Sequence, residues 1–229
     1  MLEQLRLMCV LAHPDDESLG TGGALAKYAA EGVETYLVTA TRGERGWQGA
    51  AEHNPGLTAL GAIREAELRA AAQVLGLHEV NFLGYIDGDL DQADPVEAIA
   101  KIVSHLRRVR PHVVLTFGPA GGYGHPDHIA ISQLTTAACV AAADPSYASD
   151  LPQHAVAKLY YMAISRALAD AYVAVFGDIV MHVDGVARGG VIDEDWAITT
   201  WLDTGAHQDT VWKAVFCHTS QLPAYSRLE

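Results

Sequence analysis

The length, hydrophobicity and charge of the chain restrict the classes of protein to which it can belong. With 229 residues, half of them hydrophobic, the chain is long enough to bury one sizeable core, so we expect a single domain. A formal net charge of −13 argues against partners such as nucleic acid or an anionic membrane surface.

The cysteines and the first residues indicate where the protein works. Three scattered cysteines, at positions 9, 139 and 217, argue against a disulfide framework and favour a reducing compartment. Residues 1–6 lack the basic region and the long apolar core of a signal peptide. No apolar run approaches the roughly 20 residues that a membrane-spanning helix needs. We therefore expect a cytoplasmic protein without a stable membrane anchor.

Strands and helices are predicted to alternate along the first 145 residues. The expected strands are 5–12, 33–39, 79–83 and 112–117. The expected helices are 19–30, 58–75, 95–109 and 128–142, identified by apolar residues at helical spacing. Asp94 is a good N-cap for the third helix, and Pro95 suits its first position. The alternation predicts an α/β fold: a Rossmann-like, mostly parallel sheet flanked by helices.

Two parts of the chain depart from this pattern. Residues 41–57 carry four glycines and Trp47 without an apolar period, which predicts a long loop that either lines a sugar site or is simply solvated. After residue 145 we expect strands at 156–164, 179–183 and 196–202, then a helix at 209–218, with Trp196, Trp201 and Trp212 in the core. We expect one domain over 1–229, with a core of about 1–145 and a small C-terminal extension of about 146–229.

Two similar motifs carry the candidate chemistry: His-Pro-Asp-Asp at 13–16 and His-Pro-Asp-His at 125–128. Each follows a predicted buried strand and precedes a predicted helix. Since parallel strands end at the same edge of a sheet, three His and three Asp residues should come within reach of one point. Each motif alone has an equally good alternative, a turn in which Asp caps the next helix. The pair, at two matching strand ends, favours a metal site.

Zinc is bound by imidazole nitrogen and carboxylate oxygen, and a catalytic zinc keeps one position open. His13, Asp16 and His128 are one possible set of three ligands, and Fe²⁺ or Mn²⁺ fits such a set equally well. Asp15 would then be available as the general base for the zinc-bound water. His125 and Asp127 would serve as a proton donor and as the residue that orients an imidazole ring.

The motif Ala-His-Pro-Asp-Asp-Glu at 12–17, with the later His-Pro-Asp-His, resembles the PIG-L/LmbE-like family of zinc-dependent N-acetylglucosamine deacetylases. That family includes the deacetylases of GlcNAc-phosphatidylinositol and of the mycothiol and bacillithiol pathways. The resemblance covers about the first 145 residues and implies an LmbE-like fold. It implies that the zinc ligands are His13, Asp16 and His128. It also implies that Asp15 is the base, that His125 stabilises the tetrahedral intermediate or protonates the leaving amine, and that Asp127 supports a neighbouring histidine.

The resemblance implies roles for three further residues. Arg64 matches an arginine that contacts substrate, and Tyr123 matches a tyrosine that helps to polarise the amide carbonyl. His218, in His-Thr-Ser-Gln at 218–221, matches the His-x-Ser-Gln ending of some members and is expected to bind substrate. Each has an ordinary structural alternative: an ion pair on a helix face for Arg64, packing in a glycine-rich turn for Tyr123, and a cap at a helix C-terminus for His218.

The predicted reaction is zinc-dependent hydrolysis of the N-acetyl group of a GlcNAc-type conjugate, with release of acetate and a free amine. Two alternatives stay open: a related metal-dependent amidase acting on thiol conjugates, and a non-catalytic metal-binding protein. The acidic composition and the lack of an anchor favour a small soluble conjugate as the partner. The sequence specifies neither the aglycone nor whether the chain forms a homo-oligomer.

Overall fold

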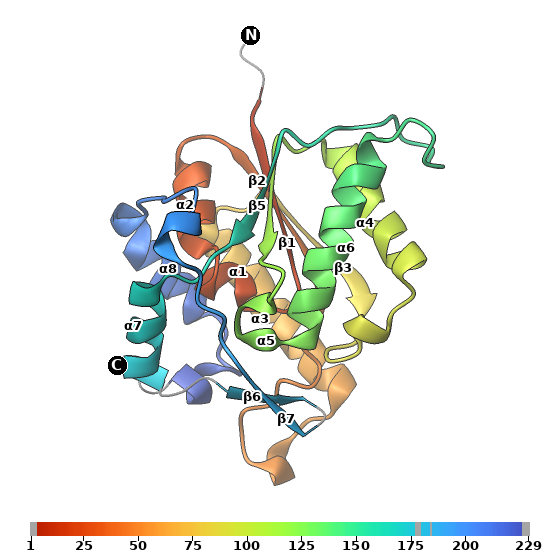
Figure 1. Cartoon of the computed structure of the whole chain (residues 1–229). Helices are drawn as coiled ribbons and strands as arrows, with labels where there is room; N and C mark the ends of the chain where they lie inside the picture. The colour runs from red at the N-terminus through yellow and green to blue at the C-terminus, as the bar shows by residue number, and fades with distance from the viewer. Residues whose placement is uncertain (1–3, 177–179, 184, 226–229) are drawn as a thin grey trace.

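A parallel sheet of five strands forms the centre of the computed structural model, which describes residues 4–176, 180–183 and 185–225 (Figure 1). Its strand order is β3-β2-β1-β4-β5, and all four strand pairs are parallel. The strands are β1 (Arg6–Leu11), β2 (Glu34–Thr41), β3 (Glu79–Tyr85), β4 (Val113–Phe117) and β5 (Lys158–Met162). The predicted α/β fold with a mostly parallel sheet is confirmed.

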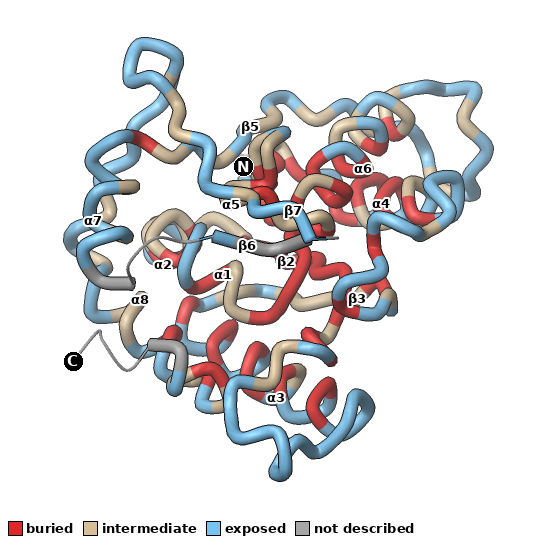
Figure 2. The backbone as a smooth tube through the Cα atoms, turned by 60° about the horizontal axis from the view of Figure 1, so that its bottom comes forward, coloured by how far each residue is buried: buried red, intermediate tan, exposed pale blue. Residues whose placement is uncertain are grey.

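The central strands β1 and β2 are buried along almost their whole length because helices cover both faces of the sheet. Cys9, Val10 and Leu11 of β1 are fully buried, as are Leu37 and Val38 of β2. Figure 2 shows that burial is concentrated in these strands and in the helices against them, while the last third of the chain is mostly exposed.

Two layers of helices enclose the sheet (Figure 1). One face carries α4 (Pro95–Val109) and α6 (Pro126–Ala143), and the other carries α2 (Gly22–Ala30), α3 (Leu57–Leu75) and α8 (Gln208–Val215). The prediction of a helix over 95–109 is confirmed at both ends. At the start of α4, the Asp94 carboxylate accepts a hydrogen bond from Val96 N at 2.9 Å, and Pro95 is the first helical residue. The helix ends at Val109. Gly76 ends α3 in the left-handed conformation.

The helix expected at 19–30 is interrupted. A short α1 (Asp16–Leu19) begins at the last residue of the first motif, and a second helix, α2, begins at Gly22. Between them, Thr21 Oγ1 donates to the carbonyl of Glu17 at 3.1 Å. A Cβ on Gly20 would lie 3.0 Å from Met162 Sδ and 3.1 Å from the carbonyl of Asp16, so the break is a place of close packing.

The last third of the chain was predicted less well. β5 lies within the strand expected at 156–164, and its pairing with β4 in the central sheet had not been predicted. β6 (Val180–Val183) coincides with the expected strand apart from residue 179, which lies outside the described residues. Two elements had not been predicted: α7 (Arg166–Phe176), and β7 (Val186–Gly189), which pairs antiparallel with β6. The division at residue 145 stays a prediction.

The strand expected at 196–202 is wrong. That region holds only a turn of 3₁₀ helix at Asp195–Ala197, and Trp196 and Trp201 are 86% and 66% exposed rather than in the core. Trp, Ile and Thr favour strands only where a neighbouring strand and a buried face are available. The remaining short elements are α5 (Gly121–Gly124) and the 3₁₀ turns Ala51–His53, Leu90–Gln92, Gly205–His207 and Leu222–Tyr225.

Within the described residues, every helix is too short or too polar to cross a lipid bilayer.

Candidate metal centre and active site

The two motifs meet at the carboxyl edge of the sheet, because β1 and β4 are neighbouring parallel strands. His13 Nδ1 lies 3.2 Å from His128 Nε2 and 3.7 Å from Asp16 Oδ2. His128 Nε2 lies 3.5 Å from Asp16 Oδ1. All three side chains are at most 11% exposed. The structure therefore brings the three predicted metal ligands together.

The spacing of these donor atoms fits a metal ion. Ligand atoms about 2.1 Å from a tetrahedral ion lie about 3.4 Å from one another. The distances of 3.2, 3.5 and 3.7 Å among the three residues agree with that spacing. Two imidazole nitrogens and one carboxylate suit zinc, and also Fe²⁺ or Mn²⁺.

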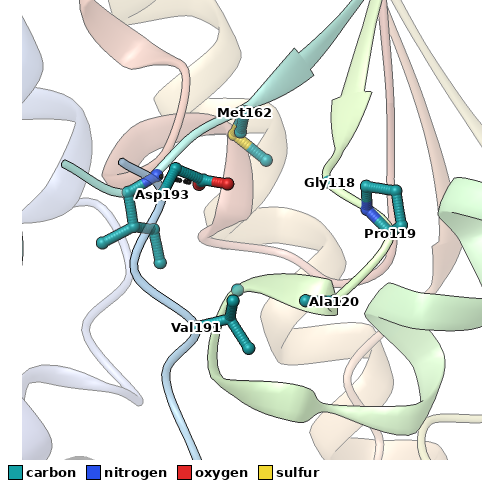
Figure 3. A pocket seen from close by; sticks show the side chains of 8 residues that line it. Gly118, Pro119, Ala120, Met162, Val191 and Asp193 are labelled. Carbon is teal, nitrogen blue, oxygen red and sulfur yellow. Dashed lines mark hydrogen bonds between the residues drawn. The ribbon is translucent and has the colours of Figure 1, made fainter. Parts of the chain in front are cut away.

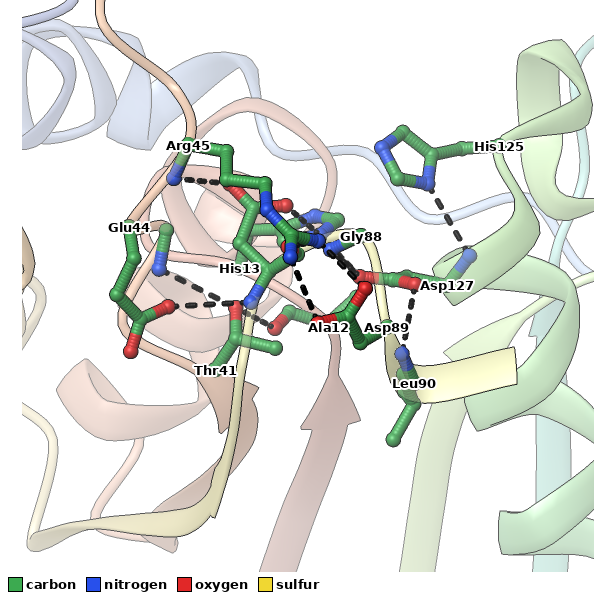
Figure 4. Close-up of polar contacts among 12 residues, drawn as sticks. Ala12, His13, Thr41, Glu44, Arg45, Gly88, Asp89, Leu90, His125 and Asp127 are labelled. Atoms are coloured by element: carbon green, nitrogen blue, oxygen red, sulfur yellow. Dashed lines mark hydrogen bonds and ion pairs between the residues drawn. The ribbon is translucent and has the colours of Figure 1, made fainter. Parts of the chain in front are cut away.

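A second group, His13, His125 and Asp127, also has donor atoms close enough for a metal. The Asp127 carboxylate is already occupied, because it accepts hydrogen bonds from Gly88 N at 2.7 Å and from Leu90 N at 3.1 Å (Figure 4). It is fully buried and lies 3.1 Å from His13 Nε2. Asp127 therefore fixes the His13 ring so that the other nitrogen, Nδ1, faces Asp16 and His128.

Asp87, which had not been singled out from the sequence, is a second carboxylate on the same ring. Its Oδ1 lies 3.1 Å from His13 Nε2, and its Oδ2 accepts a hydrogen bond from Arg45 N at 3.1 Å. Burial opposes ionisation of Asp87, but the hydrogen bond and charge of His13 lower its pKa to about 2. The sequence signal that could have identified Asp87 is its position after the third strand, at the edge of the sheet where the two motifs lie.

Asp15 lies beside the three predicted ligands. It has a left-handed backbone conformation, with φ of 97°, and precedes α1 as its N-cap. Its side chain is 17% exposed, and Oδ2 accepts a hydrogen bond from Arg64 Nη2 at 3.2 Å. Burial raises the pKa of the neighbouring Asp16 to about 7, although the charge of His13 acts in the opposite direction.

Arg64 is almost fully buried, and its guanidinium group lies inside the turn that carries Asp15. It donates to the carbonyls of Pro14 at 2.6 Å and of Gly43 at 3.0 Å. A Cβ on Gly43, whose φ is 67°, or on Gly46 would overlap Arg64 Nη1, so a larger residue at either position would displace the guanidinium group. These contacts hold Asp15 and the following loop. Direct contact of Arg64 with substrate stays a prediction.

His125 and Tyr123 lie against the ring of His128. His125 caps α6: its Nδ1 accepts the hydrogen bond of Asp127 N at 3.1 Å, so the neutral ring carries its proton on Nε2. Burial, followed by the charge of His13, lowers the pKa of His125 to about 4. The Tyr123 ring stands edge-on to His128 with the centroids 5.3 Å apart, and burial raises its pKa far above the usual range. Both are therefore neutral hydrogen-bond donors at pH 7.

Hydrogen bonds connect the start of the loop expected at 41–57 to the loop that follows β3. Glu44 is buried, and its Oε2 accepts hydrogen bonds from Asp87 N at 3.1 Å and from Arg42 N at 3.2 Å. Arg45 donates to the carbonyl of Asp87 and to the carboxylate of Asp89, each at 2.6 Å (Figure 4). The prediction that this loop lines a sugar site is not tested by these contacts.

His218 is fully buried. Its Nε2 lies 2.7 Å from Glu17 Oε1, and it follows α8, which ends at Val215. Its predicted contact with substrate therefore stays a prediction, and its partner in the structure is a carboxylate of the first motif.

A shallow hollow borders the turn between β4 and α6 (Figure 3). Its lining is mostly apolar, with Met162 and Val191 facing one another across it and Asp193 at its rim. None of the predicted site residues lines it.

A parallel α/β sheet with imidazole and carboxylate groups gathered at its carboxyl edge is the arrangement of a metal-dependent hydrolase. Residues 8–139, which include both motifs, match the family described as PIG-L, GlcNAc-PI de-N-acetylase. The chain belongs to this family and is a de-N-acetylase, a hydrolase of N-acetyl amides. The resemblance predicted from the motifs is confirmed.

A curated relative is named as a deacetylase, and a solved structure shares the fold. The chain is 39% identical to the 1D-myo-inositol 2-acetamido-2-deoxy-alpha-D-glucopyranoside deacetylase of Streptomyces griseus, over 95% of this chain and 75% of that protein. The crystal structure of the conserved protein TT1542 from Thermus thermophilus has a TM-score of 0.70 and 30% identity, and covers 98% of this chain and 85% of that one.

The fold by itself does not define the reaction. The crystal structure of GalB, the 4-carboxy-2-hydroxymuconate hydratase of Pseudomonas putida KT2440, has a TM-score of 0.74 at 21% identity, and covers 98% of this chain and 82% of that one. At that identity the likeness concerns the fold alone. The reaction has to be argued from the family and from the side chains.

Proposed function

We propose that this de-N-acetylase acts on a small GlcNAc–inositol conjugate, releases acetate and a free amine, and uses zinc held by His13, Asp16 and His128. The observation that carries the proposal is the meeting of three side chains at the sheet edge: His13 Nδ1 and His128 Nε2 lie 3.2 Å apart, and each lies 3.7 or 3.5 Å from one oxygen of the Asp16 carboxylate. The substrate class follows from the Streptomyces griseus relative, whose name specifies an acetamido sugar joined to inositol.

The metal has a defined chemical task. When bound, a divalent ion acts as a Lewis acid on the acetamide carbonyl and makes a water molecule more acidic. Asp127 and Asp87 hold the His13 ring in the orientation that such an ion requires, because each carboxylate lies 3.1 Å from Nε2.

Asp15 is the proposed general base. Its carboxylate lies outside both metal-ligand groups and remains partly exposed, so it can accept a proton from the attacking water. Arg64 keeps this carboxylate in place through Nη2. We assign Arg64 to this positioning in the free enzyme.

His125 and Tyr123 are the proposed donors on the other side of the amide. The Nε2–H of the neutral His125 ring is directed away from its own helix cap and can donate a hydrogen bond to the developing oxyanion, whereas protonation of the leaving nitrogen by His125 would need the imidazolium form. The neutral hydroxyl of Tyr123 is a donor toward the acetamide carbonyl. Together with Asp15, these residues supply the base and the hydrogen-bond donors that amide hydrolysis needs.

The test is acetate release by purified protein containing one equivalent of zinc. The panel contains the GlcNAc–inositol conjugate, free GlcNAc, a lipid-linked GlcNAc and an N-acetylated thiol conjugate, each with a chelated control. We expect zinc-dependent release that is fastest from the inositol conjugate. Release only from the thiol conjugate would indicate that the protein is an amidase for thiol conjugates. Release that is insensitive to chelation would contradict the proposed metal site.

Two finer expectations belong to this proposal. A cytoplasmic location is consistent with the three cysteines, all of which are free thiols. Assembly into a homo-oligomer stays a prediction, which the molar mass in solution will test.

A further inference from the structure

The four residues at 218–221, which follow α8, connect three segments around Asp15. His218 Nε2 lies 2.7 Å from the carboxylate of Glu17 in α1. Hydroxyl groups of the segment donate to Glu67 in α3 at 2.6 and 2.7 Å, and its last side chain donates to the carbonyl of Gly46 at 2.8 Å. The segment lies outside residues 8–139, so the match to the family does not account for it.

The two oxygens of Glu17 face in different directions. Oε2 accepts the backbone N–H of Asp15 at 2.9 Å. Oε1 accepts from Ser18 Oγ at 2.5 Å and lies against His218 Nε2. Glu17 and His218 are both fully buried, whereas the Asp15 side chain is 17% exposed. The contacts therefore connect two residues of the protein interior, His218 and Glu17, to the partly exposed Asp15.

The backbone of Asp15 needs such support. A non-glycine residue with a φ of 97° is in a conformation that L-amino acids rarely adopt, and it persists only where the surroundings hold it. The main-chain contact with Glu17 and the side-chain contact with Arg64 hold Asp15 from two sides.

We propose that Glu17 and His218 form a positioning pair: His218 holds the buried Glu17 carboxylate, which holds the main chain of Asp15 in the conformation that presents the catalytic carboxylate. This inference rests on the proposed function, in which Asp15 is the general base. When a neutral residue replaces His218, the buried Glu17 carboxylate loses its counter-charge and moves toward water. This movement takes Oε2 away from the Asp15 N–H and lets the backbone of Asp15 relax.

The pair is distinct from a substrate-binding role for His218. A fully buried side chain that is 2.7 Å from a fully buried carboxylate offers no face to a sugar in this conformation. Loss of a substrate contact raises KM, whereas displacement of the base lowers kcat. The two roles therefore predict different kinetics.

The experiment compares His218→Gln with a matched control, His154→Gln. His154 Nε2 donates to the carbonyl of Pro111 at 2.7 Å, just before β4 and therefore at the opposite edge of the sheet. For His218→Gln we expect kcat per bound zinc to fall at least tenfold, with KM within twofold and zinc content unchanged. For His154→Gln we expect unchanged kcat, whatever its effect on stability.

Two further variants test the mechanism of the pair. In the double variant Glu17→Gln/His218→Gln, an uncharged amide oxygen can accept the Asp15 N–H, so we expect at least a threefold recovery of kcat over His218→Gln. Glu17→Ala removes the acceptor directly and should lower kcat at least tenfold, which provides the same test if His218→Gln does not fold. Unchanged kcat in Glu17→Ala, or a raised KM with normal kcat in His218→Gln, would overturn the inference.

A crystal structure of His218→Gln or Glu17→Ala provides a readout that needs no substrate. We expect φ of Asp15 to leave the left-handed region and its contact with Arg64 to lengthen. If the backbone conformation of Asp15 and its contact with Arg64 were unchanged in these variants, the positioning role of Glu17 and His218 would be refuted, even if the enzyme were active on the whole panel. Conversely, full activity of Asp15→Asn would refute the base assignment and leave this crystallographic result standing.

Discussion

Replacement of Asp15 by Asn is the sharpest test of the proposed chemistry. Asn has nearly the same shape as Asp and also tolerates a positive φ, so the backbone at 97° is retained. Its amide oxygen can still accept from Arg64. The variant therefore removes the basic carboxylate and little else.

The expected loss of rate follows from the task of a general base. Such a residue contributes about 10²- to 10⁴-fold, and each factor of ten corresponds to about 1.36 kcal/mol of activation free energy. We expect kcat to fall by that factor, a rise of roughly 3 to 5 kcal/mol in the barrier. The weaker contact with Arg64 should lower stability by only about 1 kcal/mol, or 2–4 °C in Tm for a chain of this length. Unfolding therefore cannot account for the loss.

The assay is acetate release per bound zinc at saturating substrate, with Asp16→Asn as the contrasting variant. Asp15→Asn should keep its zinc, because Asp15 belongs to neither metal-ligand group. Asp16→Asn should lose much of it. More than a tenth of the normal rate in Asp15→Asn, or loss of zinc from that variant, would refute the assignment of Asp15 as the base.

Three other predictions concern the metal and the turn around it. Burial lowers the pKa of His13, but hydrogen bonds to Asp127 and Asp87 outweigh it and raise the pKa to about 10 in the metal-free protein. Zinc binds the neutral ring and the ionised Asp16 carboxylate, so between about pH 7 and pH 10 binding should release one proton and strengthen about tenfold per pH unit, and calorimetry in two buffers that shows no proton release would contradict this. Asp127→Asn should weaken zinc binding about 10- to 100-fold, measured by competition with a chelator, and an unchanged affinity would show that Asp127 does not orient His13. Gly43→Ala places a Cβ against Arg64 Nη1 at a φ of 67° and should lower the free energy of unfolding in urea by about 2–4 kcal/mol, whereas equal stability would mean that the guanidinium group is not held where the structure has it.

The parts of the fold with local signals could be predicted from the sequence. Helix α4 was predicted at both ends because Asp94, Pro95 and the apolar spacing act within one segment. The meeting of His13 with His128 was also predictable, since it follows from the rule that parallel strands end at one edge. The strand expected at 196–202 failed because pairing with a neighbour, rather than composition, decides whether a strand forms.

The contacts that support the site could not be predicted, because they join segments far apart in the sequence. Asp87 reaches His13 from a loop 74 residues along the chain, and nothing in the spacing of that loop specifies which of its carboxylates does so. Glu17 is part of a motif that was recognised, but a contact 201 residues away identifies its partner as His218. Long-range packing determines both.

The separation of Glu17 from His218 has a consequence for synthesis of the protein. β1 is the middle strand of the sheet, and its turn into α1 buries a carboxylate whose partner leaves the ribosome 201 residues later. Until then the nascent chain can pair β1 with β2 and β4, but the first turn of the site has a charge without its counterpart. Closing so long a loop is slow and entropically costly. We therefore expect the site to be the last region to become ordered after translation, and metal capture to follow completion of the fold.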